Sequence, residues 1–173
     1  MFIIAKGVDR SMSVPSELNG IIQQAVHRHM QSIVRTAYTY VQNRQDAEDI
    51  AQETFLAYLQ QKKIFESNEH EKAWLLRVCM NKSKNLLKSG WQKSRNPLPE
   101  DLAVLPPEEN TVLSAVLALE EKYRLPTHLY YYEGYALKDI ARILSLPQAT
   151  VGTRLARAKA QLKKQLGGAF DEK

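Results

Sequence analysis

Hydrophobic residues recur at steps of three and four along most of this chain. That spacing is typical of amphipathic helices, which turn one apolar face toward a core. No stretch shows the alternation of a half-buried strand, so the sequence predicts an all-α fold. The predicted helices cover residues 17–42, 46–61, 71–90, 110–122, 127–133, 137–144 and 148–166.

Polar and proline-bearing segments divide these helices into two groups. Residues 91–109 contain four prolines and no sustained periodicity, which predicts a flexible linker that is semi-rigid where the prolines lie. We therefore expect two small helical domains. Asp46 is the expected N-cap of the second helix, and Tyr123–Pro126 is the expected end of the fourth. The expected parts are a disordered leader at 1–16, a first domain at 17–90, a linker at 91–109, a second domain at 110–167 and a tail at 168–173.

The segment 135–166 predicts a helix-turn-helix. A short helix centred on Ala141 precedes the turn Ser145-Leu146-Pro147, and a longer helix follows. Pro147 suits a helix start, because the N–H that proline lacks would be unpaired there. A unit of this kind places its second helix in the major groove of DNA. No acidic residue lies between Ile140 and Gly168, which favours contact with DNA.

Charge is distributed unevenly although the net charge is only +5. Residues 72–95 hold seven Lys/Arg and no acid, whereas residues 96–121 hold six acids and no Lys/Arg. This alternation indicates separate surfaces that face nucleic acid. The single cysteine, Cys79, excludes an intrachain disulfide framework. We expect no membrane span and no signal peptide, and either Met1 or Met12 could be the start.

The remaining candidates for chemistry have simpler interpretations. His27 and His29 are two apart on a helix, so their side chains diverge and predict no metal site. The run Tyr130–Tyr132 is expected to pack the second domain. The sequence contains no phosphate-cradling glycine loop and no nucleophile–base pair. We therefore expect that the protein is not an enzyme and that it binds no cofactor.

Three blocks in order resemble one known family. DAEDIAQETF at 46–55, AWLLRVCMNKSKNLLKS at 73–89 and the segment 135–166 are similar to the bacterial extracytoplasmic-function sigma factors. These are minimal members of the sigma-70 class of RNA polymerase specificity subunits. The resemblance covers roughly residues 17–166. It implies a region 2 helical domain, a region 4 helix-turn-helix domain and a linker whose acidic charge would follow the RNA exit path.

The resemblance also implies partners and contact residues. The chain would bind the clamp and flap of core RNA polymerase, and promoter DNA that is double-stranded at −35 and single-stranded at −10. The residues implied in core binding are Asp46, Asp49, Gln52, Glu53 and Phe55. Those implied at the −10 element are Phe65, Ser67, Asn68, Lys72, Arg77, Asn81, Lys84 and Lys88. Those implied at the −35 element are Thr150, Gly152, Thr153, Arg154, Ala156, Arg157 and Lys159.

Three residues depart from the family's commoner pattern. Gly152 and Ala156 lie where larger side chains are frequent, and Ser145 lies where glycine often occupies the turn. Arg154 is the best candidate for a bidentate contact to guanine or phosphate. The family further implies an anti-sigma factor as a partner. It also implies a location in the bacterial cytoplasm, or at the membrane where a membrane-anchored anti-sigma factor holds the protein.

Two other interpretations remain open at this point. A stand-alone helix-turn-helix regulator would explain 135–166 equally well but leaves 46–55 and the basic helix unexplained. A pure interaction protein, which holds polymerase without using DNA, would need the acidic helix but not the arginines of the last helix.

Overall fold

The structure is a computed structural model, and it describes residues 16–61, 65–89 and 107–167. Every regular element in these ranges is helical, which confirms the predicted all-α fold. Most of the predicted leader (1–16) and linker (91–109), namely residues 1–15 and 91–106, and the whole predicted tail (168–173) lie outside the described residues, while residues 107–109 belong to the first described helix of the second half. The elements are α1 Ser16–Val41, α2 Arg44–Gln60, α3 Asn68–Lys88, α4 Pro107–Leu117, α5 Glu121–Thr127, the π-helix η3 His128–Tyr132, α6 Leu137–Leu144 and α7 Gln148–Leu166.

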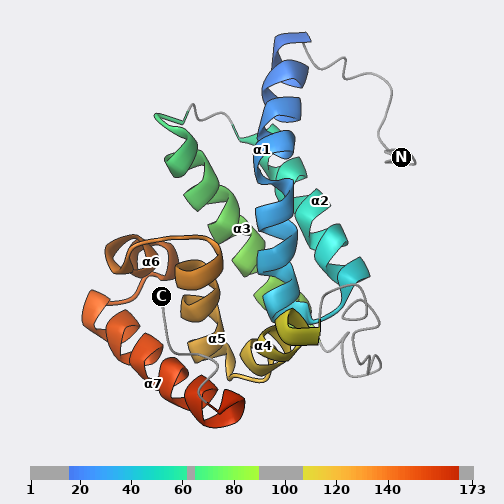
Figure 1. The fold of residues 1–173 in the computed structure, drawn as a ribbon. Helices are drawn as coiled ribbons and strands as arrows, with labels where there is room; N and C mark the ends of the chain where they lie inside the picture. Colours follow the sequence, from blue (N-terminus) through green and yellow to red (C-terminus); the bar gives the residue numbers. More distant parts are fainter. Residues whose placement is uncertain (1–15, 62–64, 90–106, 168–173) are drawn as a thin grey trace.

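The first half is a three-helix bundle in which α1 packs along both α2 and α3 (Figure 1). Ala25, Ala37 and Ala51 are fully buried, and residues this small let the helices approach closely. Leu75 and Leu76 of α3 are also fully buried, and burial of a leucine side chain stabilises a fold by about 1.5–3 kcal/mol. This bundle fixes the orientation of both α2 and α3.

Side-chain caps define where α2 and α3 begin. Asn43, and not Asp46, caps α2, because its side chain accepts a hydrogen bond from the Asp46 N–H at 2.9 Å. The prediction of Asp46 as N-cap was wrong: the helix starts two residues earlier, so Asp46 lies inside its first turn. Ser67 caps α3 by accepting from the His70 N–H at 3.1 Å. A cap of this kind stabilises a helix by about 1 kcal/mol.

The second half packs α4, α5 and α6 against α7 (Figure 1). The predicted helix break at Tyr123–Pro126 was wrong, because the break lies at 118–120 and α5 runs through Pro126. Burial of Tyr123 and Leu125 outweighs the one helical hydrogen bond that Pro126 cannot donate. The helix then widens into η3, a π-helix, which is a form often found at functional sites.

The two halves share a buried interface. Leu125, Leu129, Ile140 and Ile143 join the same apolar cluster as the core of the first bundle. The Gln42 amide donates across the junction to the Leu117 carbonyl at 3.1 Å. The halves therefore pack directly on each other. Within the described ranges, no helix combines the length and apolarity that a membrane crossing requires.

Candidate nucleic-acid interface

The predicted helix-turn-helix is formed by α6, a tight turn and α7. Ser145 ends α6 in the left-handed conformation, with φ of 54°. The next N–H, of Leu146, donates to the Ala141 carbonyl at 2.9 Å and closes the turn. This arrangement is the one that glycine commonly provides at a helix end. Ile140 and Val151, both fully buried, hold the two helices together.

One face of α7 presents the side chains expected to meet duplex DNA. Thr153, Ala156, Arg157 and Lys159 are all exposed. Arg157 lies one turn after Thr153, and Lys159 lies one turn after Ala156. The Thr153 hydroxyl donates to the Ala149 carbonyl at 3.0 Å, so this hydroxyl is already paired within the helix. The other members of the predicted set, all half-buried, are Thr150, Gly152 and Arg154.

A second basic face runs along α3. Its exposed residues recur at steps of four, three and four, which places them on one side of the helix. They are Arg77, Asn81, Lys84 and Lys88. Three cations and one amide at this spacing suit contacts with successive phosphates, which give affinity but little sequence information.

The segment before α3 carries the residues expected to read a displaced base. Ser67 and Asn68 are exposed at the start of the helix. Phe65 is half-buried, and its ring stacks on Tyr58 with the centroids 5.7 Å apart and the planes 9° apart. Trp74 packs against both rings, as a core residue would. Phe65 therefore supports this segment, and Ser67 and Asn68 present polar atoms to solvent.

The acidic helix α2 exposes only part of the set predicted for core binding. Asp49, Gln52 and Glu53 are exposed on one face, and Glu53 pairs with Lys82 of α3 at 3.0 Å. Asp46 and Phe55 are each only 5% exposed. Phe55 belongs to the bundle core, because its position one turn from Ala51 lies on the buried side of the helix. The core-binding prediction for these two side chains therefore needs correction.

Two of the predicted −10 cations are held by the second half of the molecule. Lys72 pairs with Glu133 at 2.8 Å, and its ammonium lies 5.3 Å from the centre of the Tyr135 ring. Arg77 donates from Nη2 to the Arg142 carbonyl at 2.9 Å. Between these contacts lies a polar cleft of about 1020 Å³ lined by residues of both halves, among them Ser67 and Asn68. The expected single-strand site thus opens onto the junction.

Glu133 is the centre of this junction. Its side chain is only 4% exposed, and it accepts hydrogen bonds from Lys72 and from the Ser32 hydroxyl of α1. Burial alone would raise the pKa of Glu133, but those two hydrogen bonds and the charge of Lys72 lower it below its usual value. Glu133 is therefore a buried anion that holds a lysine expected to bind a phosphate.

His128 lies beside Glu133, with Nε2 3.6 Å from its Oε1 and 3.1 Å from the Thr36 hydroxyl. The pKa of His128 is lowered to about 4, chiefly by burial; the Glu133 charge opposes this shift, and the charges of Arg35 and Lys72 add to it. The ring is therefore neutral at pH 7. It fastens η3 to α1 through a neutral hydrogen bond.

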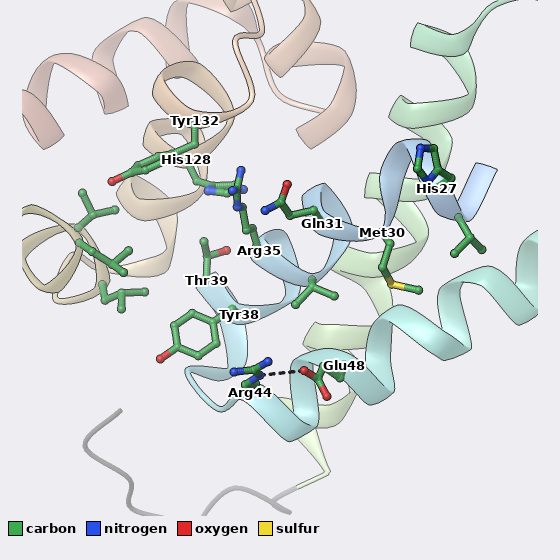
Figure 2. A pocket seen from close by; sticks show the side chains of 15 residues that line it. His27, Met30, Gln31, Arg35, Tyr38, Thr39, Arg44, Glu48, His128 and Tyr132 are labelled. Carbon is green, nitrogen blue, oxygen red and sulfur yellow. Dashed lines mark hydrogen bonds and ion pairs between the residues drawn. The ribbon is translucent and has the colours of Figure 1, made fainter. Parts of the chain in front are cut away.

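A largely apolar groove of about 860 Å³ opens on the other side of the junction. Figure 2 shows Met30 and Tyr38 of α1 along it, His128 and Tyr132 of η3 opposite Arg35, and the Arg44–Glu48 ion pair at one end. Leu113, Val116 and Leu117 of α4 complete its lining. The groove joins surfaces from both halves.

The sequence interpretation missed the junction and misplaced the tyrosine run. Tyr130, Tyr131 and Tyr132 are 41–45% exposed, so the expectation that they pack the second domain was wrong. His128 and Leu129 are the residues of η3 that are buried. A π-helix shifts the register by which side chains face the core, and local periodicity does not reveal that shift.

Comparison with known proteins places these features in a family. The model for "Sigma-70 region 2" matches residues 25–93, and that for "Sigma-70, region 4" matches residues 109–162. The ECF RNA polymerase sigma factor SigW of Bacillus subtilis is 30% identical over 154 residues, which cover 78% of this chain and 82% of SigW. The RNA polymerase sigma-H factor of Pseudomonas aeruginosa is 27% identical, covering 82% of this chain and 83% of that protein.

Two solved structures share the fold. The sigma factor RpoE of Bartonella quintana, solved with the anti-sigma factor NepR, matches with a TM-score of 0.68 and 23% identity over 86% of this chain and 98% of RpoE. CnrH, solved with the cytosolic domain of CnrY, matches with a TM-score of 0.67 and 24% identity over 87% of this chain and 90% of CnrH. The two family models and the similarity to SigW establish that the chain belongs to the extracytoplasmic-function sigma factors of the sigma-70 family.

Proposed function

We propose that this sigma factor binds core RNA polymerase through the exposed face of α2 and contacts a promoter with two separate surfaces. Arg154, Arg157 and Thr153 of α7 would contact the −35 element as duplex. The segment 65–68 and the basic face of α3 would contact the opened −10 strand. Sigma factors are transcription initiation factors and not enzymes, so these contacts would choose where polymerase starts and help to open the DNA.

The observation that carries this proposal is the presence of three distinct surfaces in one small chain. The exposed acidic face of α2 suits a basic protein partner, whereas the basic faces of α3 and α7 suit DNA. A stand-alone helix-turn-helix regulator would need only α7, and it would leave the region 2 match at 25–93 without a purpose. The proposal places the protein in the bacterial cytoplasm, where core polymerase works.

The proposal is tested by adding purified protein to core polymerase and measuring co-purification and run-off transcription. The substitution Asp49→Arg reverses one charge on the exposed face of α2, and we expect it to weaken core binding. Lys122→Glu, a charge reversal at an exposed residue of α5 (its ammonium pairs with Glu120), is the control and should leave core binding unchanged. Equal core affinity of Asp49→Arg and wild type would remove α2 from the interface.

We further propose that an anti-sigma factor occupies the groove in Figure 2. One structural neighbour, RpoE, was solved with an anti-sigma factor, and the groove offers apolar side chains from both halves to an amphipathic helix. Met30→Lys would add a charge to its floor, while the aliphatic part of lysine can still cover the apolar surface. Transcription in the cell of origin should rise while run-off transcription with purified core stays unchanged. A parallel change in both assays would contradict this partner site.

A further inference from the structure

A buried carboxylate lies beneath the proposed single-strand site without taking part in any of the contacts assigned above. Glu71, in the first turn of α3, is 6% exposed. Its Oε1 accepts hydrogen bonds from Arg28 at 3.1 Å and from His29 Nε2 at 2.9 Å, both on α1. Its Oε2 accepts from the Tyr58 hydroxyl of α2 at 2.8 Å. One side chain thus joins all three helices of the first bundle.

The donors around Glu71 are in the protonation states that this arrangement needs. Burial lowers the pKa of His29, so the ring is neutral at pH 7 and can donate one N–H to the carboxylate. Burial, followed by the hydrogen bond to Glu71, raises the pKa of Tyr58 to about 12. The tyrosine therefore keeps its proton and donates it. Three directional hydrogen bonds fix the Glu71 carboxylate, and the Tyr58 bond in turn fixes the Tyr58 ring.

The Tyr58 ring carries that constraint to the segment before α3. Phe65 stacks on Tyr58 at 5.7 Å, and the edge of His70 meets the Phe65 ring at 5.7 Å. The Glu71 N–H donates to the Ser67 carbonyl at 3.0 Å. Residues on both sides of Ser67 and Asn68 are therefore tied, by backbone and by ring contacts, to Glu71 and Tyr58.

We propose that Glu71 and Tyr58 are positioning residues for base selection at the −10 element. They hold Phe65 and the first turn of α3 so that Ser67 and Asn68 meet a displaced base in one geometry. This inference rests on the proposed function of that segment. Neither residue contacts DNA itself, and each acts through the aromatic and backbone contacts described above.

A carboxylate suits this role better than it suits simple packing. A buried ionic cluster often stabilises a fold less than apolar residues of the same volume would, because its charges lose their hydration. Its hydrogen bonds are directional, however, and a recognition site needs its supporting residues held to within about 0.5 Å. Loss of this network should therefore alter selectivity and not merely lower affinity for every sequence.

The test uses holoenzyme reconstituted from core polymerase and the full chain. The probe is a forked DNA whose single-stranded −10 segment is randomised, and the bound fraction is sequenced. Tyr58→Phe removes only the hydroxyl that reaches Glu71. Tyr40→Phe is the matched control, because Tyr40 is also buried in this bundle and its hydroxyl has no hydrogen-bond partner among the described residues.

We expect wild type and Tyr40→Phe to enrich the same motif. Tyr58→Phe and Glu71→Gln should lower discrimination at the captured base about fivefold or more, the lower limit for loss of one good base contact. Core affinity and preference at the other positions should not change. The effects of the two substitutions should be less than additive in the double variant, because both act on the contact between Glu71 and Tyr58.

Two results would overturn this inference: unchanged discrimination in Tyr58→Phe, or equal weakening at every position, which is the signature of a purely structural role. Thermal unfolding of each variant accompanies the assay, and Tyr58→Phe alone decides if Glu71→Gln does not fold. Failure of the wild-type holoenzyme to enrich any motif would instead contradict the proposed function itself.

Discussion

The two surfaces proposed to contact DNA differ in how accessible they are in the structure. On α7, Arg157 and Lys159 face solvent. On α3, Lys72 is paired with Glu133 and Arg77 with the Arg142 carbonyl, both from the other half of the molecule. The proposed −35 surface therefore faces solvent, whereas two cations of the proposed −10 surface, Lys72 and Arg77, would have to leave their partners in the second half to bind phosphates.

If the proposed surfaces bind promoter DNA, this difference predicts that the −35 element is bound more readily than the −10 element by the chain without core polymerase. A cation that is already paired with a buried carboxylate gains less from a phosphate than a solvated one, because the internal contact must first be broken. Binding of core polymerase can shift the halves apart only as far as it binds the separated arrangement more tightly. The variants below change one surface or the other.

The largest effect is expected from combined substitution of Arg154 and Arg157 by alanine. Each arginine should contribute roughly 1–3 kcal/mol to duplex binding. Promoter-directed run-off transcription should be lost, while co-purification with core polymerase is retained. Lys122→Ala removes one positive charge in the same half and should preserve transcription. Unchanged promoter activity in the double variant would remove α7 from DNA recognition.

The next largest effect is expected at the proposed −10 surface, where Lys72 is paired with Glu133 of the second half. Glu133→Gln keeps the shape of the side chain but removes the charge that holds Lys72. Hydrogen bonds to charged groups contribute about 1.5–3 kcal/mol, so opening should become easier by up to that amount. The free chain should then bind a single-stranded oligonucleotide about tenfold more tightly, measured by fluorescence anisotropy.

The matched control for Glu133→Gln is Glu48→Gln, which removes the carboxylate of the exposed Arg44–Glu48 pair. It should leave oligonucleotide binding unchanged. If Glu133→Gln also had no effect on single-strand affinity, the contact with Lys72 would not limit access to the −10 surface, and the two surfaces would be equally available.

The features of the fold and of the candidate site that could be predicted from the sequence are those that depend on residues close together in the chain. The periodicity around Ala25 and Ile33, and around Ile140 and Val151, predicted their helices, because one buried stripe repeats at each turn. The exposed position of Asp49 followed from the same rule, whereas Asn81 and Arg157 were singled out by the resemblance to the family. The cap at Asn43 was missed because Asn43 and Asp46 are both good capping residues, and backbone geometry decides between them.

The junction could not be predicted, because its contacts join residues far apart in the chain. Ser32 and Lys72 both contact Glu133. The local sequence around each of these three residues gives no indication of the other two. Likewise Glu71 looks like one more acid in the first turn of a helix until its partners on α1 and α2 are seen. Ser145 in a left-handed turn is a case where a composition rule, which favours glycine, was overridden by the surrounding hydrogen bonds.

A third prediction uses pH to loosen the junction. His128 has a pKa of about 4 when folded and about 6.5 when unfolded, so below pH 6.5 the unfolded chain binds a proton that the folded chain does not. The free energy of unfolding should therefore decrease as the pH is lowered, by about 2 kcal/mol between pH 6.5 and pH 5. His128→Gln should remove this part of the slope in denaturant unfolding, and an unchanged slope would show that His128 is not the group responsible.

The smallest effect is expected at Gly152 in α7. A Cβ atom there would lie 3.6 Å from the Leu137 Cδ2, an ordinary contact, so alanine fits. Gly152→Ala should stabilise the helix by about 0.5–1 kcal/mol and raise the melting temperature by roughly 2–4 °C. Promoter preference should not change, since the added methyl group would lie against Leu137 of α6. A lower melting temperature would mean that the helix needs glycine at this position.

The most direct measurement is run-off transcription by core polymerase with and without the purified protein, with start sites mapped across a genomic library. We predict new starts that share one upstream duplex element and one element at the opened strand, both lost without the protein. Start sites that are the same with and without the protein would contradict its assignment as the specificity subunit of the polymerase.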